Sequence, residues 1–568
     1  MEAQRNKILW IQGVILFLVS ILISGYSIYS GNQAVQIPLI QSLKNPNLFP
    51  NDPFVSALQY YPSPIWGLIS VLSTFINLET LLLLLFLFTR ALAIFASANL
   101  AISLNPDSWL APAGAMAFIA LIPSPLLGHG TLLINYFEHT SLSIAFLLIA
   151  VSAFYSKKRL TWMVFLTLGF YTNIMYGTFA SIYFAAAFLI DANYRRNWKN
   201  WIIPFLLFMV LISPLIFSTL ISIETQGFDR ELWITVSKIR HPYHLFPLTW
   251  EPYRFNLFLA LIFLAGLTLY LIREKNSILF KHYLAWTIVA IIFLLTALSA
   301  AYLFRNPAML STQPARGTDL WFVFSAIAVI TALSFLVESD GNDKRMYSLF
   351  YFFSVFWTWY FKSPTLIEVI FIVVTILIIW NPAWITIFRK GDSQRLSNLV
   401  VLIVFVLGWI TFSIRFYSDR VISLVDQPSS QIQEIASWAQ QNTSIEDMFL
   451  IDPNWSEFRA LSQRSVFVTW KDGTAILWKG NFVNEWVSRI ELFGFDFFKT
   501  DEVGTPDGLR YLSKLYNNLD DRQVLKLARK YPIHYWVVQG NHPSEFPVVY
   551  QTQAYKILNL IPEGDNGS

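Results

Sequence analysis

The sequence contains no cysteine, which excludes disulfide bonds, thiolate nucleophiles and cysteine metal sites. Charged residues make up 13% of the 568 residues, whereas soluble proteins carry roughly 25%. No P-loop sequence occurs that would drive transport with ATP, and no G-x-S-x-G sequence that would indicate a serine hydrolase. The net charge of +4 is small, and we expect no nucleic-acid partner.

Hydrophobic residues account for 55% of the chain and aromatic residues for 17%. Apolar runs of about 20 residues recur, and this is the length that a helix needs to cross a bilayer. The sequence therefore predicts an all-α polytopic membrane protein with about thirteen transmembrane helices. The first run is too long for a cleaved signal peptide and lacks its small-residue cleavage site, so we interpret it as a retained span. The expected spans are 8–29, 79–101, 110–125, 140–156, 160–175, 177–190, 200–221, 254–272, 282–303, 319–337, 346–361, 364–380 and 397–414.

Lysine and arginine in short loops indicate which loops stay in the cytoplasm. They occur near Arg5 and in the loops 157–159, 195–199 and 273–281. All of these lie on one side if residues 61–77 form a re-entrant or interfacial helix; if that segment crossed, the loop 157–159 would lie outside. We adopt the first arrangement, with a cytoplasmic N-terminus, an extracytoplasmic C-terminal part and a location in the cytoplasmic membrane.

The character of the sequence changes near residue 421, where apolar runs shorten and charges return. We therefore expect a multi-span domain over 1–420 and a small extracytoplasmic α/β domain over 421–568. Helical and alternating patterns predict helices at 431–441, 508–519 and 521–531, and strands at 447–452, 465–470 and 534–539.

Polar residues gather in the loops expected on the outer side, from Asn51 and Asp52 to Arg305 and Arg316. Each has a structural alternative. Asn-Asp-Pro commonly starts a turn or caps a helix, and arginines that flank spans often reach for the interface. His129 and His139 are ten residues apart and lack the i, i+4 spacing of two ligands on one helix face, so no metal site is predicted.

Two further basic features have competing interpretations. Arg90 lies within the expected span 79–101, where an ionised group is costly and often functional, although an arginine there can also extend to the interface. The stretch FRALSQRSVFVTWK, residues 458–471, combines basic and aromatic residues. We interpret it as a domain surface and strand core in preference to a face that contacts sugar or phosphate.

Two short stretches carry a resemblance to a known class. PNLFPNDPF, residues 46–54, resembles the first-loop signature of uncharacterised bacterial members of the GT-C class of membrane glycosyltransferases. That class includes oligosaccharyltransferase catalytic subunits and protein O-mannosyltransferases. IASWAQQNTSIEDMFLID, residues 435–452, resembles the entry to their C-terminal domains. The expected layout of spans and outer domain is similar to that of the class.

The resemblance implies an inverting glycosyltransferase that moves a sugar from a polyprenyl-phosphate-linked donor to a glycan, lipid or protein acceptor outside the cell. Asp52 matches the first-loop catalytic acid, which would act as the base, and Glu138 occupies the second outer loop, where relatives often keep another acidic residue. Arg316, and less securely Arg305, lies in the late loop that holds lipid-linked phosphate in relatives. The other substrate-binding candidates are Asn51, Tyr60, Tyr61, His129, His139, Arg240 and His244.

The sequence departs from the class in two ways. The first-loop pair is Asn-Asp where others have two acids, and the WWD motif of oligosaccharyltransferases is absent. These departures argue against asparagine-linked protein glycosylation and against a required divalent metal. The sequence requires no cofactor, and a divalent cation stays an alternative. The alternatives are a lipid or saccharide transporter or flippase, in which Arg90 would line a continuous path, and a non-catalytic scaffold.

Overall fold

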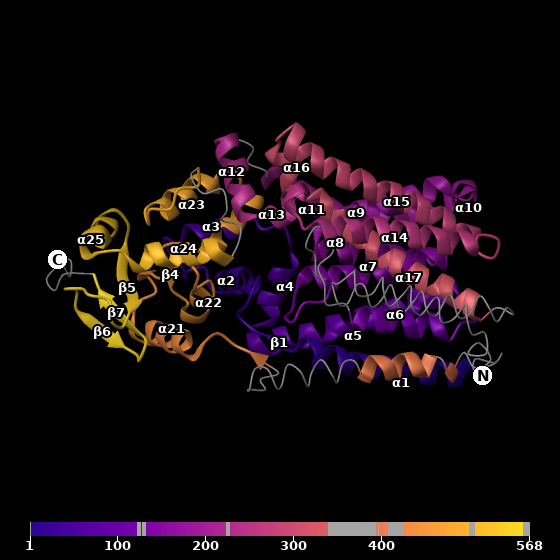
Figure 1. The fold of residues 1–568 in the computed structure, drawn as a ribbon, viewed down its shortest axis with the longest axis horizontal. Helices are drawn as coiled ribbons and strands as arrows, with labels where there is room; N and C mark the ends of the chain where they lie inside the picture. Colours follow the sequence, from indigo (N-terminus) through magenta and orange to yellow (C-terminus); the bar gives the residue numbers. More distant parts are fainter. Residues whose placement is uncertain are drawn as a thin grey trace, which may run out of the picture.

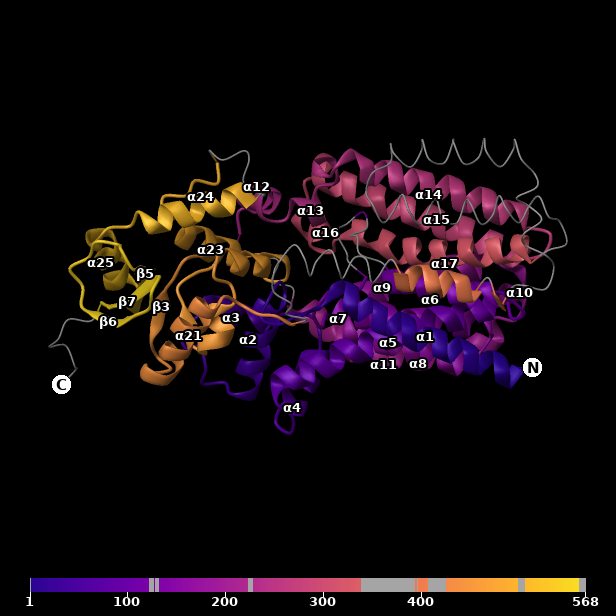
Figure 2. The ribbon, with the colours of Figure 1, turned by 60° about the horizontal axis from the view of Figure 1, so that its bottom comes forward.

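The molecule is elongated, with a helical bundle at one end and a part that contains helices and a β-sheet at the other (Figure 1). The N-terminus and the C-terminus lie at opposite ends in both views (Figures 1 and 2). This computed structural model describes residues 2–121, 127, 132–222, 228–338, 394–395, 397–406, 425–498 and 506–560.

The apolar runs of the bundle form helices, and several begin at an asparagine that caps the first turn. Asn77, Asn173 and Asn276 each accept hydrogen bonds from backbone N–H groups that have no partner within the helix. Every span expected up to residue 337 overlaps one of these helices. They are α1 (Glu2–Ser24), α5 (Leu78–Leu104), α6 (Leu110–Leu121), α7 (His139–Tyr155), α8 (Arg159–Thr172), α9 (Ile174–Ile190), α11 (Lys199–Ser222), α14 (Pro252–Leu271), α15 (Ser277–Leu298) and α17 (Gly317–Val337).

Within the described residues, 6 helices are long and apolar enough to cross a membrane, and α6, α7 and α9 are shorter apolar helices. The expected spans 346–361 and 364–380 lie outside the described residues, as does the end of 397–414, so the count of thirteen stays a prediction. Within the segment 61–77, α4 (Ile65–Leu72) has 8 residues. At about 1.5 Å per residue, α4 is too short to cross a bilayer.

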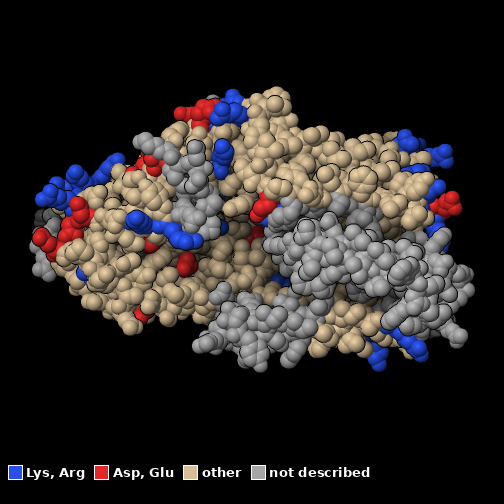
Figure 3. Space-filling view, in the orientation of Figure 1, with Lys and Arg blue, Asp and Glu red and all other residues tan. Residues whose placement is uncertain are grey.

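The helices of the bundle differ in how deeply they are buried. The segment Pro307–Phe335 is 94% buried, whereas Lys199–Ser218 is 28% buried. Ile203, Val210 and Phe263 are large apolar residues that point outward. Charged residues gather at the two ends of the face in Figure 3 and are sparse over the middle of the bundle. An apolar belt between two charged ends is the surface that a bilayer would cover.

The C-terminal part is built on a five-stranded sheet with the order β4-β3-β5-β7-β6. The strands β3, β4 and β5 run parallel to one another, and β7 pairs antiparallel with β5 and β6. The three strands expected from the sequence are present, while β6 and β7 were not expected. The elements are α21 (Ser430–Asn442), β3 (Met448–Leu450), α22 (Phe458–Ser462), β4 (Ser465–Val466), α23 (Phe482–Glu491), α24 (Pro506–Asn517), α25 (Asp521–Lys530), β5 (Ile533–Gln539), β6 (Val548–Gln551) and β7 (Tyr555–Asn559).

Segments from the N-terminal half pack into this C-terminal part. Ile37, Phe54 and Trp233 belong to the same buried apolar cluster as Phe467 and Trp486. The C-terminal part is therefore built from three stretches of sequence, two of which precede the expected boundary at residue 420. The elements added from before residue 420 are β1 (Tyr26–Ser27), which pairs in parallel with β2 (Val425–Asp426), α2 (Gln33–Lys44), α3 (Pro53–Leu58), α12 (Arg230–Arg240) and α13 (Pro242–Leu245). Of these, α2, α3 and α12 pack beside the 3₁₀ helix η5 (Trp470–Leu477) of the C-terminal part.

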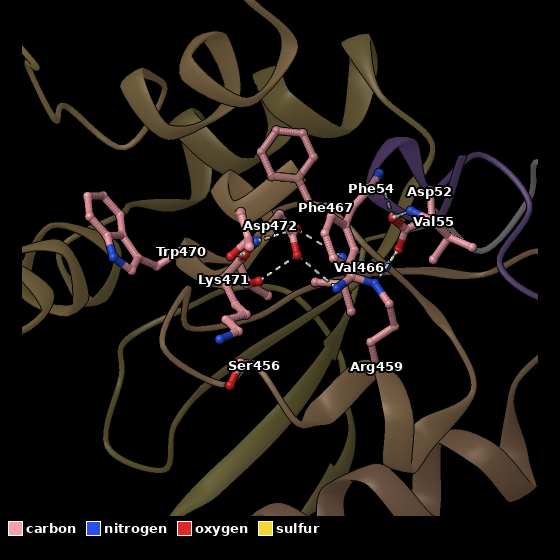
Figure 4. A network of polar contacts seen from close by, with 12 residues as sticks. Asp52, Phe54, Val55, Ser456, Arg459, Val466, Phe467, Trp470, Lys471 and Asp472 are labelled. Carbon is pink, nitrogen blue, oxygen red and sulfur yellow. Dashed lines mark hydrogen bonds and ion pairs between the residues drawn. The ribbon is translucent and has the colours of Figure 1, made fainter. Parts of the chain in front are cut away.

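A buried ionic cluster joins the first loop to the C-terminal part (Figure 4). The Arg459 Nε donates to Asp52 Oδ2 at 2.7 Å, and Nη1 and Nη2 donate to the two carboxylate oxygens of Asp472 at 2.9 and 3.0 Å. All three side chains are buried. Burial alone would lower the pKa of the Arg459 guanidinium, but Asp472 and Asp52 together raise it. Arg459 is therefore fixed as a cation between two anions.

The carboxylate of Asp52 also caps α3. Its Oδ1 accepts from the backbone N–H groups of Phe54 and Val55 at 3.1 and 3.2 Å. Its Oδ2 accepts from the N–H of Val466 at 3.0 Å in addition to Arg459. Asp52 thus satisfies donors from the first loop, α22 and β4 at once, which explains why a charged residue is stable in this interior.

We expect Arg459→Met to lower the stability of the purified protein by about 3–5 kcal/mol, because two buried carboxylates would lose their counter-ion. Thermal unfolding in detergent measures this. As a control, Asp520→Asn alters an exposed capping carboxylate of α25, and it should leave stability within about 0.5 kcal/mol because Asn caps as well as Asp. Unfolding of Arg459→Met at the wild-type temperature would contradict the structural role of the cluster.

Candidate functional site

A cavity of about 1220 Å³ opens where the bundle meets the C-terminal part. Its walls come from the loop before α4, the first residues of α7 and α9, α12 and α13, the segment before α17, and η5. Figure 1 shows α4, α12, α13 and α16 (Pro307–Ser311) at this junction. The cavity therefore exists only when the two parts are assembled.

Glu138 is the acidic residue among the described residues that line the cavity. It caps α7, and its carboxylate accepts from the amide groups of Asn32 at 3.1 Å and Gln36 at 3.0 Å. The Glu138 Oε1 lies 2.5 Å from His139 Nδ1. Burial alone would raise the pKa of Glu138, but His139, Asn32 and Gln36 outweigh it and lower the pKa to about 2. The carboxylate is therefore ionised at neutral pH.

His139 follows Glu138 at the first turn of α7 and also faces the cavity. Its Nε2 lies 3.3 Å from Asn173 Nδ2 and 3.5 Å from the Tyr61 hydroxyl. The rings of Tyr61 and Trp66 meet the imidazole edge to face, with centroids 5.8 and 5.2 Å away. Aromatic packing and two polar contacts thus hold the ring in one orientation.

Four basic side chains line the same cavity: Arg230, Arg240, Arg316 and Lys471. Arg240 donates to the carbonyl oxygen of Trp470 and to Thr474 Oγ1, which anchors it on η5. Arg316 donates to Gln313 Oε1 at 3.1 Å and lies over the Tyr176 ring. With Glu138 as the counter-charge, this lining has an excess of positive charge and favours an anionic ligand.

Lys471 links the basic side of the cavity to the carboxylate side. Its Nζ donates to Asn32 Oδ1 at 2.9 Å, and Asn32 in turn donates to Glu138. Burial and the charge of Arg240 lower the pKa of Lys471 to about 7, against the attraction of Glu138. A lysine with this pKa exchanges its proton near neutral pH.

The rest of the wall is apolar. Leu39, Leu43, Ile174, Phe179 and Leu215 come from α2, α9 and α11. Among these helices, α11 carries many of the large apolar residues that point outward from the bundle. The cavity therefore joins a polar, basic end to an apolar flank, the combination that an amphipathic anion requires.

Most of the residues expected at a site do come together here. Glu138, His139, Arg240 and Arg316 were predicted from three separate loops. The predicted residues that line the cavity are Tyr60, Tyr61, Glu138, His139, Arg240, His244 and Arg316. His129 lies outside the described residues.

Three predicted residues do not line the cavity. Asp52 is buried in the ionic cluster with Arg459, so the expectation that it faces the site does not hold, and its capping role is the structural alternative that the Asn-Asp-Pro sequence allows. Asn51 is an exposed turn residue with a φ of 63°, next to that cap. Arg305 pairs with Glu231 at the surface, where charge pairing holds it away from the cavity.

Several lining residues were not predicted as site residues. Asn173 caps α9 and its side chain also contacts His139, whereas Asn32 lies at the start of α2 without capping it and donates to Glu138. The sequence indicates only that both asparagines lie where a helix begins. Lys471 belongs to the basic-aromatic stretch that we interpreted as surface and core. Its exposure to a cavity depends on the packing of η5 against the first loop, which no local pattern reveals.

Arg90 is buried in α5 and does not line the cavity. Its guanidinium donates to the carbonyl oxygens of Ser20 at 3.2 Å and Ile134 at 2.8 Å, and it lies over the Phe86 ring at 4.7 Å. Arg90 thus ties α1 to the segment before α7. These contacts give it a structural role in place of the path-lining role that a transporter would require.

A family model described as a domain of unknown function, DUF6798, matches residues 430–493, the segment that holds Arg459 and Lys471. No curated protein matches the chain. Among solved structures, the fold is similar to that of the archaeal oligosaccharyltransferase AglB from Archaeoglobus fulgidus, in complex with an inhibitory peptide and a dolichol-phosphate. The TM-score is 0.48 and the identity 12%, over 95% of this chain and 69% of that one. A similarity at this level transfers no residue role.

Within the part of the chain that the structure describes, no three His, Asp or Glu side chains converge on a point that could hold a metal ion. Glu138 and His139 contact each other directly, and the neighbouring side chains at the cavity are amides, a phenol and bases. The arrangement is one for hydrogen bonding, proton transfer and anion binding.

We expect Lys471 to react with an amine-selective acylating reagent at pH 7 faster than an exposed lysine such as Lys526. With a pKa of about 7, about half of Lys471 is the neutral nucleophile, against roughly one part in a thousand for an ordinary lysine. Peptide mass spectrometry after brief labelling measures the ratio, and Lys471→Arg removes the signal. Equal labelling of the two lysines would show that Lys471 is fully charged or inaccessible.

Proposed function

We propose that this protein is a membrane glycosyltransferase that transfers a sugar from a polyprenyl-phosphate-linked donor to an extracytoplasmic acceptor. The observation that carries the proposal is the cavity, in which basic side chains and an ionised Glu138 adjoin an apolar flank at the end of the bundle. A lipid phosphate has the same two parts, an anionic head and an apolar tail.

The basic side chains supply what the leaving group needs. As the sugar departs, its phosphate gains negative charge, and arginine stabilises that charge through paired hydrogen bonds. Arg240 and Arg316 approach the cavity from α12 and from the turn before α17. In this proposal they hold the phosphate, while the apolar wall around Ile174 and Phe179 receives the first isoprene units.

The acceptor side needs a group that takes a proton. We assign this end of the site to the Glu138–His139 pair in place of Asp52, because Asp52 is buried and its carboxylate is engaged with Arg459. A positioned acid or base of this kind contributes roughly 10²–10⁴-fold to a rate. Attack by an acceptor hydroxyl in a single displacement would invert the configuration at the sugar carbon.

The orientation follows from the two ends of the bundle. The N-terminus and α10 (Ala192–Arg196), with its two arginines, lie at the end away from the C-terminal part (Figure 1). With basic loops on the cytoplasmic side, the cavity faces outward, where polyprenyl-linked sugars meet extracytoplasmic acceptors. The exposed apolar residues Leu68 and Val71 of α4, and Phe75 just after it, would then lie at the outer surface of the bilayer.

In a deletion strain, we expect wild type to restore an extracellular glycan or glycolipid and Glu138→Gln to restore about 10²-fold less or none. Glutamine keeps the size of the side chain and removes its charge. The measurement is mass spectrometry of envelope glycans at matched expression. Glu446→Gln, which alters an exposed carboxylate, is the control and should restore fully. Full restoration by Glu138→Gln would mean that the transfer does not take place at this cavity.

The apolar flank can be tested at Gly67, which lines the cavity on α4 and has open space around the position of a Cβ. We expect Gly67→Trp to reduce binding of a C₅₅ polyprenyl phosphate at least tenfold and to affect inorganic phosphate little. Gly67→Ala should bind both as wild type does. Both substitutions favour the helix, so unfolding would not explain a loss. Binding is measured by titration in detergent, and equal loss for both ligands would contradict the tail site.

A further inference from the structure

The amide of Asn173 has a fixed orientation. Its Oδ1 caps α9 by accepting from the N–H groups of Met175 and Tyr176 at 3.1 and 3.2 Å. Its Nδ2 must therefore be the atom that faces Thr140 Oγ1 at 3.0 Å and His139 Nε2 at 3.3 Å. An amide nitrogen is a donor only, and a flipped amide would lose both capping bonds.

This orientation determines the protonation of His139. Because Asn173 Nδ2 can only donate, the His139 Nε2 that faces it must carry a lone pair and no proton. The single proton of the neutral ring then lies on Nδ1. That nitrogen lies 2.5 Å from Glu138 Oε1, which puts the protonated side of the ring next to the carboxylate. The two contacts agree on one tautomer, with Nδ1 as the donor and Nε2 as the acceptor.

The two ring nitrogens are held unequally. The contact of Nδ1 with Glu138 is short, whereas the contacts of Nε2 with Asn173 and the Tyr61 hydroxyl are 3.3 and 3.5 Å, longer than a normal hydrogen bond. His139, Asn173 and Tyr61 all line the cavity. Nε2 is therefore the basic nitrogen that a ligand in the cavity would meet, and Nδ1 lies against the Glu138 carboxylate.

We propose that His139 Nε2 is the proton acceptor for the acceptor substrate and that Glu138 is a positioning residue that acts through it. This rests on the proposed glycosyl transfer. The acceptor oxygen forms a bond to the anomeric carbon of the sugar, and the bond from that carbon to the phosphate oxygen breaks with its electron pair leaving on the phosphate. The hydroxyl proton moves to Nε2. The imidazolium that results is neutralised by Glu138, and it returns the proton to water or to the departing phosphate.

Tyr61 and Asn173 mark where the acceptor hydroxyl binds. An oxygen that replaced the long contact from Asn173 would lie within hydrogen-bond distance of Nε2 and beside the Tyr61 hydroxyl. Trp66, whose ring meets the imidazole at 5.2 Å, keeps the other side of the ring from water. The acceptor hydroxyl is therefore expected to bind beside Tyr61 and the first turns of α7 and α9.

The test compares His139→Asn, His139→Ala and Glu138→Gln in purified protein reconstituted in lipid nanodiscs. The donors are synthetic C₂₀ polyprenyl phosphates that each carry one labelled sugar, and turnover is followed with the donor that wild type uses. His139→Asn retains a side-chain N–H toward Glu138 and loses the basic nitrogen. For His139→Asn we expect kcat to fall about 10²-fold or more, with the donor KM within about threefold of the wild-type value. Added imidazole should restore turnover by His139→Ala and should not stimulate the wild-type protein. Glu138→Gln should also lose about 10²-fold, and no more than His139→Asn, because the glutamine still places an oxygen beside Nδ1 but no longer neutralises the imidazolium.

Each outcome is decisive for one proposal. If wild type transfers sugar, Glu138→Gln is inactive and His139→Asn is nearly normal, then Glu138 is itself the base, and the assignment to His139 is overturned while the function stands. If wild type uses no donor, the proposed function fails. A second measurement is independent of turnover: ¹⁵N-histidine NMR of the intact protein, with His139→Asn to identify the signal, should show the proton on Nδ1. A proton on Nε2 would overturn the inference.

Discussion

The pairing of Arg459 with Asp52 and Asp472 is the interaction on which the rest of this arrangement depends. It joins residues 407 positions apart in the sequence, and it brings the first loop, α22 and η5 to one point. Burying three charges is costly unless each is paired and hydrogen-bonded, and here every carboxylate oxygen has a donor. The cavity walls from α2, α4 and η5 keep their places because this point is fixed.

Charged residues gather in two adjacent regions that differ in exposure, the buried ionic cluster and the cavity. In the ionic cluster two carboxylates share one guanidinium and all three side chains are buried, so this region fixes the packing of the segments that it joins. In the cavity, which adjoins the cluster, Lys471 and the arginines leave an excess of positive charge. Lys471 and Asp472 are consecutive, yet Lys471 lines the cavity and Asp472 is buried in the ionic cluster.

Composition and periodicity predicted the helical bundle, the short α4 and most of the C-terminal elements, because these depend on local apolar patterns. The residues of the cavity were predicted in good part, since Glu138, His139 and Arg316 are polar residues at the ends of apolar runs. Asp52 was assigned to the site from a resemblance, and its partner Arg459 could not be found from the sequence because nothing local links them. Asn173 was missed because a capping asparagine looks the same whether or not its second nitrogen contacts a histidine.

The parallel pairing of β1 with β2 sets an order of assembly during synthesis. Tyr26 pairs with Val425 and Asp52 pairs with Arg459. The first loop therefore leaves the ribosome long before its partners do. Because segments made early fold first only where their contacts are local, the bundle can insert before the outer layer closes. The cavity is then completed only after η5 has been made, and a chain that stopped before residue 470 would lack that wall.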